Sequence, residues 1–309
     1  MCSSQKEVTE MTKCELFNDN FQNYKLYGIP KAQLVIADLP YRLEDKAYAS
    51  NPVWYKDGDN ENGESKKAHA SFFPSDDYFN IVEYFSFCNR LLRKDKEKDI
   101  DDKEELIGKS GKRKSQSGAM ICFCSFQQYQ FLVDTAARYG FPNSQPIFFI
   151  KDYSAQVLKA NMKIVGATEM AVVFWRDRLP KFNNDCHMIY DWFKWERDGK
   201  DFPKIHPTQK PQSILRKLIE IYTDPGDVVI DPVAGSGSTL LAAREMGRNA
   251  YGFEISKEFY AKAETIMLKT PDKVKDVVAK SFVKDTTVQL DIFGGGSYKW
   301  LIISILRTI

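Results

Sequence analysis

The feature that most constrains the fold is a short apolar strand that runs directly into a glycine turn and then into a helix. Residues 228–230 are Val-Val-Ile, and a run of small and polar residues follows: Asp231, Pro232, Val233, Ala234, Gly235, Ser236, Gly237, Ser238 and Thr239. Glycine has no Cβ, so a ligand can approach the backbone of such a turn closely. In open α/β sheets, ligands bind beyond the carboxyl ends of the strands. The segment therefore predicts a ligand site at the end of a buried parallel strand.

An acidic residue follows at a spacing that suits an adenosine ligand. Glu254 ends the next predicted strand, residues 249–253, about 20 residues after the turn, where a carboxylate can accept hydrogen bonds from a ribose. A dinucleotide fits less well, because Leu240 stands where the GxGxxG pattern has its third glycine. Taken singly, the turn could be an ordinary strand-to-helix connection and Glu254 a surface carboxylate. Their spacing favours an adenosine-type cofactor.

The rest of the chain alternates apolar strands with amphipathic helices. Further strands are predicted at 34–37, 119–125, 146–150 and 170–175, and helices at 77–92, 127–139, 211–222, 238–246 and 257–268. This alternation predicts an α/β fold, a Rossmann-like doubly wound and mostly parallel sheet. The 309 residues, of which 43% are hydrophobic, suffice for one large domain or for a catalytic domain with an insert.

Composition narrows the class of protein. Charged residues make up 28% of the chain but the net charge is only +2, so a DNA-binding face would have to be local. The six cysteines show no CxxC pair or zinc spacing, which predicts structural thiols and no metal site. Residues 1–20 lack the apolar core of a signal peptide, and the apolar run 300–305 is too short to span a bilayer. We therefore expect a cytoplasmic protein without a membrane partner.

A second strand end carries chemistry of its own. The strand at 34–37 runs into Asp38, Leu39, Pro40 and Tyr41. These residue types suit a reaction in which the exocyclic amine of a base is the nucleophile. Such an amine is a poor nucleophile, because its lone pair is delocalised into the ring. A carboxylate and a fixed carbonyl can each accept an amine hydrogen, proline stiffens the loop, and tyrosine offers a face on which an extruded base can stack. Alone, the tetrapeptide is more often a simple turn, so it gains meaning only together with the glycine turn.

A third segment decides the comparison with known families. Residues 206–211 read His-Pro-Thr-Gln-Lys-Pro and lie just before the glycine turn. In this order, the three segments resemble the permuted-order (beta-class) DNA amino-methyltransferases, the adenine-N6 and cytosine-N4 family. In that family an Asp-Pro-Pro-Tyr corner comes early and the cofactor turn late. The resemblance covers roughly residues 14–270, and two fainter pieces agree: the segment around Asp19 and the strand that carries Glu169.

The resemblance implies S-adenosylmethionine as methyl donor and a role for each matching residue. Asp38 and the Leu39 carbonyl would hold the target amine on the loop stiffened by Pro40, and Tyr41 would stack on the flipped base. Glu254 would bind the ribose and Asp19 the adenine of the cofactor. The residues expected around the rest of the cofactor are Asp38, His206, Thr208, Lys210, Asp231, Pro232, Ala234, Gly235, Ser236, Gly237, Ser238 and Thr239.

Two departures and several alternatives accompany this interpretation. Leu39 replaces the first proline of the corner, and Val233 and Ala234 replace an aromatic residue and its small neighbour. Asp38 at the head of the corner favours adenine in this family, whereas cytosine-N4 enzymes more often carry serine there. Cytosine-N4 methylation, an RNA or protein amide target, and a decayed nucleotide- or DNA-binding regulator remain alternatives.

The predicted organisation places DNA recognition between the two halves of the methyltransferase. Residues 14–150 form the catalytic half, with insertions at 42–75 and 93–117, residues 205–270 the cofactor half, and residues 271–309 a C-terminal extension. Residues 151–204 are the predicted target-recognition region, because basic and aromatic residues alternate there. Duplex DNA is the expected partner. A cognate restriction endonuclease and a second copy of the chain are further candidate partners.

Overall fold

The computed structural model describes residues 12–40, 79–94, 117–153, 156–159, 164–184, 187–206 and 208–269. They belong to one compact unit, Met1–Leu268, apart from the residue that follows it. Four predicted features lie outside the described residues: Tyr41, the insertion at 42–75, most of the insertion at 93–117, and the extension at 271–309.

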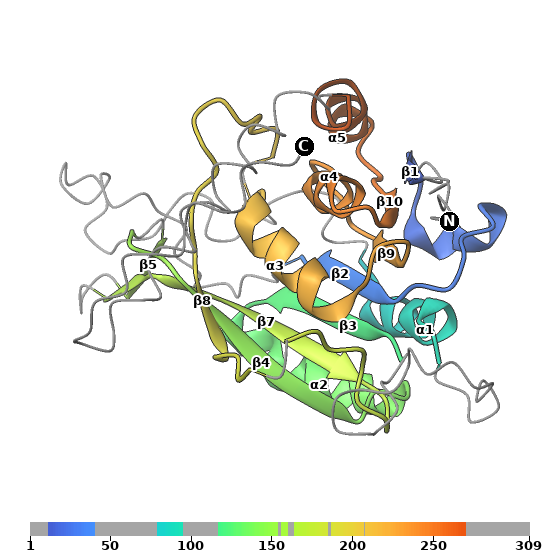
Figure 1. The fold of residues 1–309 in the computed structure, drawn as a ribbon. Helices are drawn as coiled ribbons and strands as arrows, with labels where there is room; N and C mark the ends of the chain where they lie inside the picture. The colour runs from blue at the N-terminus through green and yellow to red at the C-terminus, as the bar shows by residue number, and fades with distance from the viewer. Residues whose placement is uncertain are drawn as a thin grey trace, which may run out of the picture. The chain divides into compact units, whose positions relative to one another are not determined.

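An eight-stranded sheet, in the order β1-β10-β9-β2-β3-β7-β4-β8, forms the centre of the unit (Figure 1). The strands are β1 (Cys14–Phe17), β2 (Leu34–Asp38), β3 (Ala119–Cys124), β4 (Asn143–Ile150), β7 (Thr168–Trp175), β8 (Trp192–Lys194), β9 (Val228–Asp231) and β10 (Asn249–Phe253). Within the run β1-β10-β9-β2-β3, all neighbouring strands pair in parallel, and so do β4 and β8. Strand β7 is antiparallel to both β3 and β4. The prediction of a doubly wound, mostly parallel sheet is confirmed.

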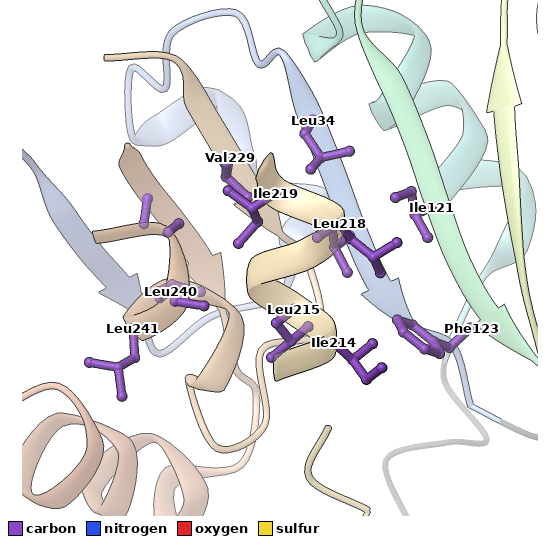
Figure 2. Packing of buried hydrophobic residues seen from close by; sticks show 14 of the residues in the cluster. Leu34, Ile121, Phe123, Ile214, Leu215, Leu218, Ile219, Val229, Leu240 and Leu241 are labelled. Carbon is purple, nitrogen blue, oxygen red and sulfur yellow. The ribbon is translucent and has the colours of Figure 1, made fainter. Parts of the chain in front are cut away.

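Helices cover both faces of this sheet, and each face has its own apolar core. Helices α3 (Gln212–Tyr222) and α4 (Ser238–Glu245) pack on one face, and α1 (Ile81–Leu91) and α2 (Tyr129–Arg138) on the other. Successive residues of a strand point to opposite faces, so Leu34 and Ile36 of β2 join the α3 core while Val35 and Ala37 join the α1 core. Figure 2 shows Leu215, Leu218 and Ile219 of α3 turned toward the strands.

Local sequence signals set where several helices begin. The Asn80 side chain accepts hydrogen bonds from the backbone of Val82 and Glu83 and caps α1. Helix α3 starts directly after Pro211, whose lack of an N–H costs nothing at that position.

The last predicted helix, 257–268, is α5 (Lys257–Lys262) continued by a π-helical turn, η7 (Ala263–Met267). Strands β4 and β7 begin three and two residues earlier than predicted, at Asn143 and Thr168.

The predicted recognition region, 151–204, contributes directly to the sheet. Strand β7 lies in the interior of the sheet and β8 at its edge. A separate two-stranded sheet, β5 (Gln156–Lys159) with β6 (Ile164–Gly166), connects β4 to β7. Any recognition surface in this region is therefore built on the same sheet that carries the predicted catalytic and cofactor-binding segments. Across the described ranges, no helix is both long and apolar enough to span a membrane.

Candidate functional site

The acidic residues singled out by the sequence gather at one edge of the sheet. Strand β2 ends in Asp38 and β9 in Asp231, while Glu254 directly follows β10. Strand β1 lies beside β10, with Phe17 opposite Phe253, and Asp19 follows two residues later. Because these strands are parallel, their carboxyl ends share one edge, which is where open α/β sheets bind ligands.

The glycine turn depends on two residues in the left-handed backbone region. Gly235 has φ 51° and Gly237 φ 75°, a conformation that costs a residue with a Cβ about 1–2 kcal/mol. The Gly235 N–H donates to Glu254 Oε2 at 2.8 Å, and the Ser256 N–H donates to Glu254 Oε1 at 2.7 Å. Glu254 is therefore fixed against the turn, as its predicted ribose-binding role requires. Burial raises the pKa of Glu254, although these backbone donors oppose the shift.

Asp231 lies under the same turn. Its Oδ1 accepts a hydrogen bond from the Val233 N–H at 3.1 Å, and Thr239 donates to the carboxylate from the first turn of α4. Burial raises the pKa of Asp231 to about 7 in spite of these donors. The nearby carboxylates of Asp38 and Glu254 act in the same direction. A positively charged ligand group at this edge would relieve that repulsion.

The predicted adenine contact is held in place from the β1 side. Asn18 donates to the Glu254 carbonyl at 2.8 Å, which joins the ends of β1 and β10. Asp19 accepts hydrogen bonds from Tyr27 at 2.6 Å and Asn23 at 2.8 Å. The Tyr27 hydroxyl, above all, lowers the pKa of Asp19.

The corner after β2 is fixed by two hydrogen bonds from outside it. The Leu39 N–H donates to the Phe123 carbonyl at 3.1 Å, which continues the β2–β3 pairing by one residue. The Gln128 side chain donates to the Pro40 carbonyl at 2.9 Å. These contacts hold the backbone that carries the Leu39 carbonyl, the predicted acceptor for the target amine. Gln128, at the start of α2, was not predicted from the sequence.

The loop before α3 contacts the glycine turn through His206. A Cβ placed on Gly235 would lie 3.7 Å from the His206 ring, and the ring packs edge-on against Phe259 at 4.4 Å between centroids. The Thr208 N–H donates to His206 Nδ1 at 3.3 Å. Burial, with a smaller contribution from Lys210, lowers the pKa of His206 to about 4. The imidazole is therefore neutral at neutral pH.

The same loop contacts the catalytic corner through Lys210. Its Nζ lies 2.6 Å from Asp38 Oδ2 and 3.5 Å from Glu169 Oε2. Burial favours a lower pKa for Lys210, but the carboxylates of Asp38 and Glu169 outweigh it and the pKa is raised. Lys210 is therefore charged in the folded protein. Through His206 and Lys210, one short loop joins the two predicted halves of the site.

Besides Gln128, further side chains that the sequence did not single out lie around Lys210. Lys151 donates to Glu169 Oε1 at 2.5 Å, and the Phe123 ring lies 5.0 Å from the Lys210 ammonium. Glu169 had been noted only as part of a strand that resembles the family. Phe123 is the last residue but one of β3, and Lys151 directly follows β4. Their positions near the carboxyl ends of two strands are the sequence signal that could have found them.

Two cations of the predicted recognition region contact other parts of the protein. Arg176 donates to Asn89 and packs against the Phe141 ring, and Lys181 is buried between Asp224 and Asp227. In contrast, the rings of Tyr190 and Trp192 stack on each other with 5.8 Å between their centroids, and both side chains are exposed. Lys194, on β8, is largely exposed as well.

Comparison with known proteins agrees with this geometry. The sequence profile of the DNA methylase family matches residues 32–265, which is most of the chain. The chain belongs to the DNA methylase family. Its members include the N6 and N4 enzymes, so the family resemblance drawn from the three segments is confirmed.

Curated relatives match over shorter stretches. The DNA adenine methyltransferase YhdJ of Escherichia coli (strain K12) is 30% identical over 139 residues, which are 41% of this chain and 45% of YhdJ. The Type II methyltransferase M.BglII of Bacillus subtilis is 36% identical over 81 residues, 26% of this chain and 22% of that protein. The matched parts thus span less than half the length of these relatives.

Solved structures share the fold at low sequence identity. The M1.HpyAVI–SAM complex superposes with a TM-score of 0.53 at 21% identity, over 81% of this chain and 97% of that one. The PvuII DNA methyltransferase, described as cytosine-N4-specific, gives a TM-score of 0.57 at 14% identity, over 88% and 92%. The chain therefore has the α/β fold of S-adenosylmethionine-dependent methyltransferases.

Proposed function

We propose that this protein is an S-adenosylmethionine-dependent DNA methyltransferase that methylates N6 of a flipped-out adenine in duplex DNA. The observation that carries the proposal is the loop before α3. His206 lies at the glycine turn and Lys210 contacts Asp38 at 2.6 Å, so a cofactor at the turn and a base at the corner would be neighbours. Base flipping is required, because an adenine inside the duplex cannot reach such an edge.

The residues at the turn fit the cofactor. Gly235 and Gly237 present no side chain. Glu254 accepts hydrogen bonds from the backbone of Gly235, Ser256 and Ile255, and a carboxylate has roughly four lone-pair positions, which leaves acceptor capacity for a ribose hydroxyl. Asp38 adds negative charge where the methionine end would lie, and a carboxylate favours a nearby cation. A cation there would in turn favour the charged form of Asp231, whose pKa burial raises to about 7. S-adenosylmethionine supplies a methyl group activated by a positively charged sulfur.

The chain's own residues then perform positioning and electrostatic work. Asp38 and the Leu39 carbonyl each accept a hydrogen of the target amine and favour its tetrahedral form. The nitrogen becomes cationic as it gains the methyl group, so the carboxylate of Asp38 stabilises the charge that develops in the transition state. Neutral His206 packs beside the turn without adding a positive charge.

Two observations favour adenine over cytosine. Asp38 heads the corner, and YhdJ, a relative with 30% identity, is named as an adenine methyltransferase. The structural likeness to the cytosine-N4-specific PvuII enzyme reports the fold alone. Residues 151–204 are proposed to read the DNA, and the exposed Tyr190–Trp192 stack and Lys194 belong to their solvent-facing surface. A cognate nuclease and a homodimer stay predictions.

The experiment is methyl transfer from isotopically labelled S-adenosylmethionine to unmethylated DNA, followed by mass spectrometry of the nucleosides. We expect label in 6-methyladenine, and a loss of about 10²–10³-fold in the Asp38→Ala variant. Asp134→Ala is the matched control and should retain activity, because Asp134 is exposed on α2 and accepts a hydrogen bond from Gln130 of the same helix. Label in 4-methylcytosine would assign the enzyme to cytosine. Cofactor binding with no labelled DNA would contradict the proposal.

A further inference from the structure

Four side chains of alternating charge form a chain that ends at the catalytic corner. Lys151 Nζ lies 2.5 Å from Glu169 Oε1, Lys210 Nζ lies 3.5 Å from Glu169 Oε2, and Lys210 Nζ lies 2.6 Å from Asp38 Oδ2. Glu169 thus uses different oxygens for the two lysines. The four residues come from the end of β4, the start of β7, the loop before α3 and the end of β2.

An aromatic layer lies under the two lysines. Lys210 is 5.0 Å from the Phe123 ring and Lys151 is 4.8 Å from the Trp195 ring. Phe149 connects these rings, stacked on Phe123 at 5.2 Å and edge-on to Trp195 at 6.1 Å. Phe149 is fully buried, and Trp195 nearly so. Charges interact more strongly beside such a low-dielectric surface than in water, so each member of the chain influences the next.

We propose that Glu169 is a positioning residue for methyl transfer: it fixes Lys210 against Asp38 and offsets the positive charge of Lys210, so that the negative charge of Asp38 remains available to the target amine. This inference rests on the proposed methyltransferase function. Glu169 contacts Lys210, and Lys210 contacts Asp38, so Glu169 would act through Lys210.

The formal charges explain why the offset matters. The formal charges of the two lysines and the two carboxylates sum to zero. Without the Glu169 charge, the group carries +1 next to a nitrogen that becomes cationic as its bond to the methyl carbon forms and the carbon–sulfur bond breaks. The nitrogen later releases its proton to water. A net positive charge nearby therefore opposes the transition state more than it opposes binding of the neutral base.

The test compares three variants of the full-length protein in single-turnover methyl transfer at saturating cofactor and DNA. Glu169→Gln should slow the reaction about tenfold or more, the scale that loss of an outer-shell partner produces at other sites, with the dissociation constants for cofactor and DNA within about threefold. Adding Lys151→Met returns the charge sum to zero, so the double variant should transfer methyl groups at least about threefold faster than Glu169→Gln does. Glu220→Gln, which breaks an exposed pair with Lys217 on α3, is the control.

A purely structural role for Glu169 predicts that the loss of rate follows a loss of folded protein, because Lys151 would stay buried without its carboxylate. Rates are therefore expressed per folded molecule, with the folded fraction of each variant taken from urea unfolding. A double variant as slow as Glu169→Gln, or a single variant within about twofold of wild type, overturns the inference. If Glu169→Gln does not fold, Glu169→Asp keeps the charge and should stay within about threefold of wild type, and a tenfold loss would then overturn the inference. An inactive wild-type protein would instead contradict the proposed function, so the two failures are distinct.

Discussion

Two buried lysines lie at opposite edges of the same sheet, each between two carboxylates. At the carboxyl edge, Lys210 lies 2.6 Å from Asp38 and 3.5 Å from Glu169. At the amino edge, Lys181 lies 2.8 Å from Asp224 and 2.7 Å from Asp227. Their side chains are almost equally buried, with 6% and 8% exposed. Burial and ion pairing alone therefore do not distinguish a functional lysine from a structural one.

The difference lies in where the partners come from and what surrounds them. Asp224 and Asp227 belong to one turn, in which the Asp224 N–H also donates to Asp227, and Asn183 donates to Asp224. The side chains of this cluster thus bond to one another, and they join the loop that carries Lys181 to the start of β9. The partners of Lys210 come from strands far apart in the sequence, beside a left-handed glycine turn and two more acids. Convergence of distant segments at the carboxyl edge of the sheet is what sets apart Lys210, the lysine that we propose to be functional.

The largest expected effect separates the two lysines directly. Lys210→Met should lower the rate of methyl transfer about 10²-fold, because Asp38 loses the partner that orients it. Lys181→Met should leave the rate per folded molecule unchanged and should lower the unfolding free energy by about 2–3 kcal/mol, because Asp227 stays buried without its cation. Single-turnover assays and urea unfolding measure both quantities for both variants. Equal losses of rate in the two variants would show that Lys210 is also structural.

The two edges should also respond to pH in opposite directions. Burial raises the pKa of Asp231 from 3.8 to about 7, so between these values the folded protein binds more protons than the unfolded chain. Rising pH therefore lowers the stability through this window, by at most about 1.4 kcal/mol per pH unit, and has no further effect above it. Asp231→Asn should abolish this decline. Urea unfolding from pH 4 to pH 8 tests it, and parallel curves for wild type and variant would contradict it.

At the amino edge the sign is reversed. Partial burial favours a higher pKa for Asp224, but the hydrogen bond and charge of Lys181 outweigh it and the pKa is lowered. The carboxylate of Asp224 therefore stabilises the fold above its ordinary pKa, and this stability is lost as the pH falls through the lowered value. In Asp224→Asn the unfolding free energy should depend less on pH below about pH 4. A steeper acid dependence in that variant would contradict this assignment.

The smallest expected effect concerns one glycine at each edge. Gly235 has φ 51° in the cofactor turn, and Gly226 has φ 85° in the turn that Lys181 anchors. Replacing either with alanine should lower the unfolding free energy by about 1 kcal/mol, the cost of a Cβ in the left-handed region. A Cβ at Gly226 would meet nothing within 4 Å, whereas one at Gly235 would point toward His206. Calorimetric titration should therefore show weaker cofactor binding in Gly235→Ala only, and equal affinities would contradict the proposed site.

Local patterns gave the strand ends and most of the candidate residues. The apolar runs before Asp38 and Asp231 predicted β2 and β9. The position of Glu254 at the end of the next strand, about 20 residues after the turn, predicted an acid beside the turn, and its carboxylate accepts a hydrogen bond from Gly235 there. The antiparallel run of β7 was not predicted, because an apolar strand reads the same in either direction. Nor were Gln128 and Lys151, single polar residues whose partners lie 88 and 18 positions away in the chain.

The sequence by itself determined the alternating α/β order, the glycine turn, the helix caps and the membership of three segments in one family. The first three features depend on contacts among residues a few positions apart, which a local pattern can encode, and the family membership depends on the residue types at matching positions. The tertiary structure alone decided which acids Lys210 meets. The order β9-β2-β3-β7 and the reversed direction of β7 bring the start of that strand, with Glu169, to the edge where the parallel strands end. Strand order and direction are set by packing of the whole sheet against its helices, and no short stretch of sequence contains that information.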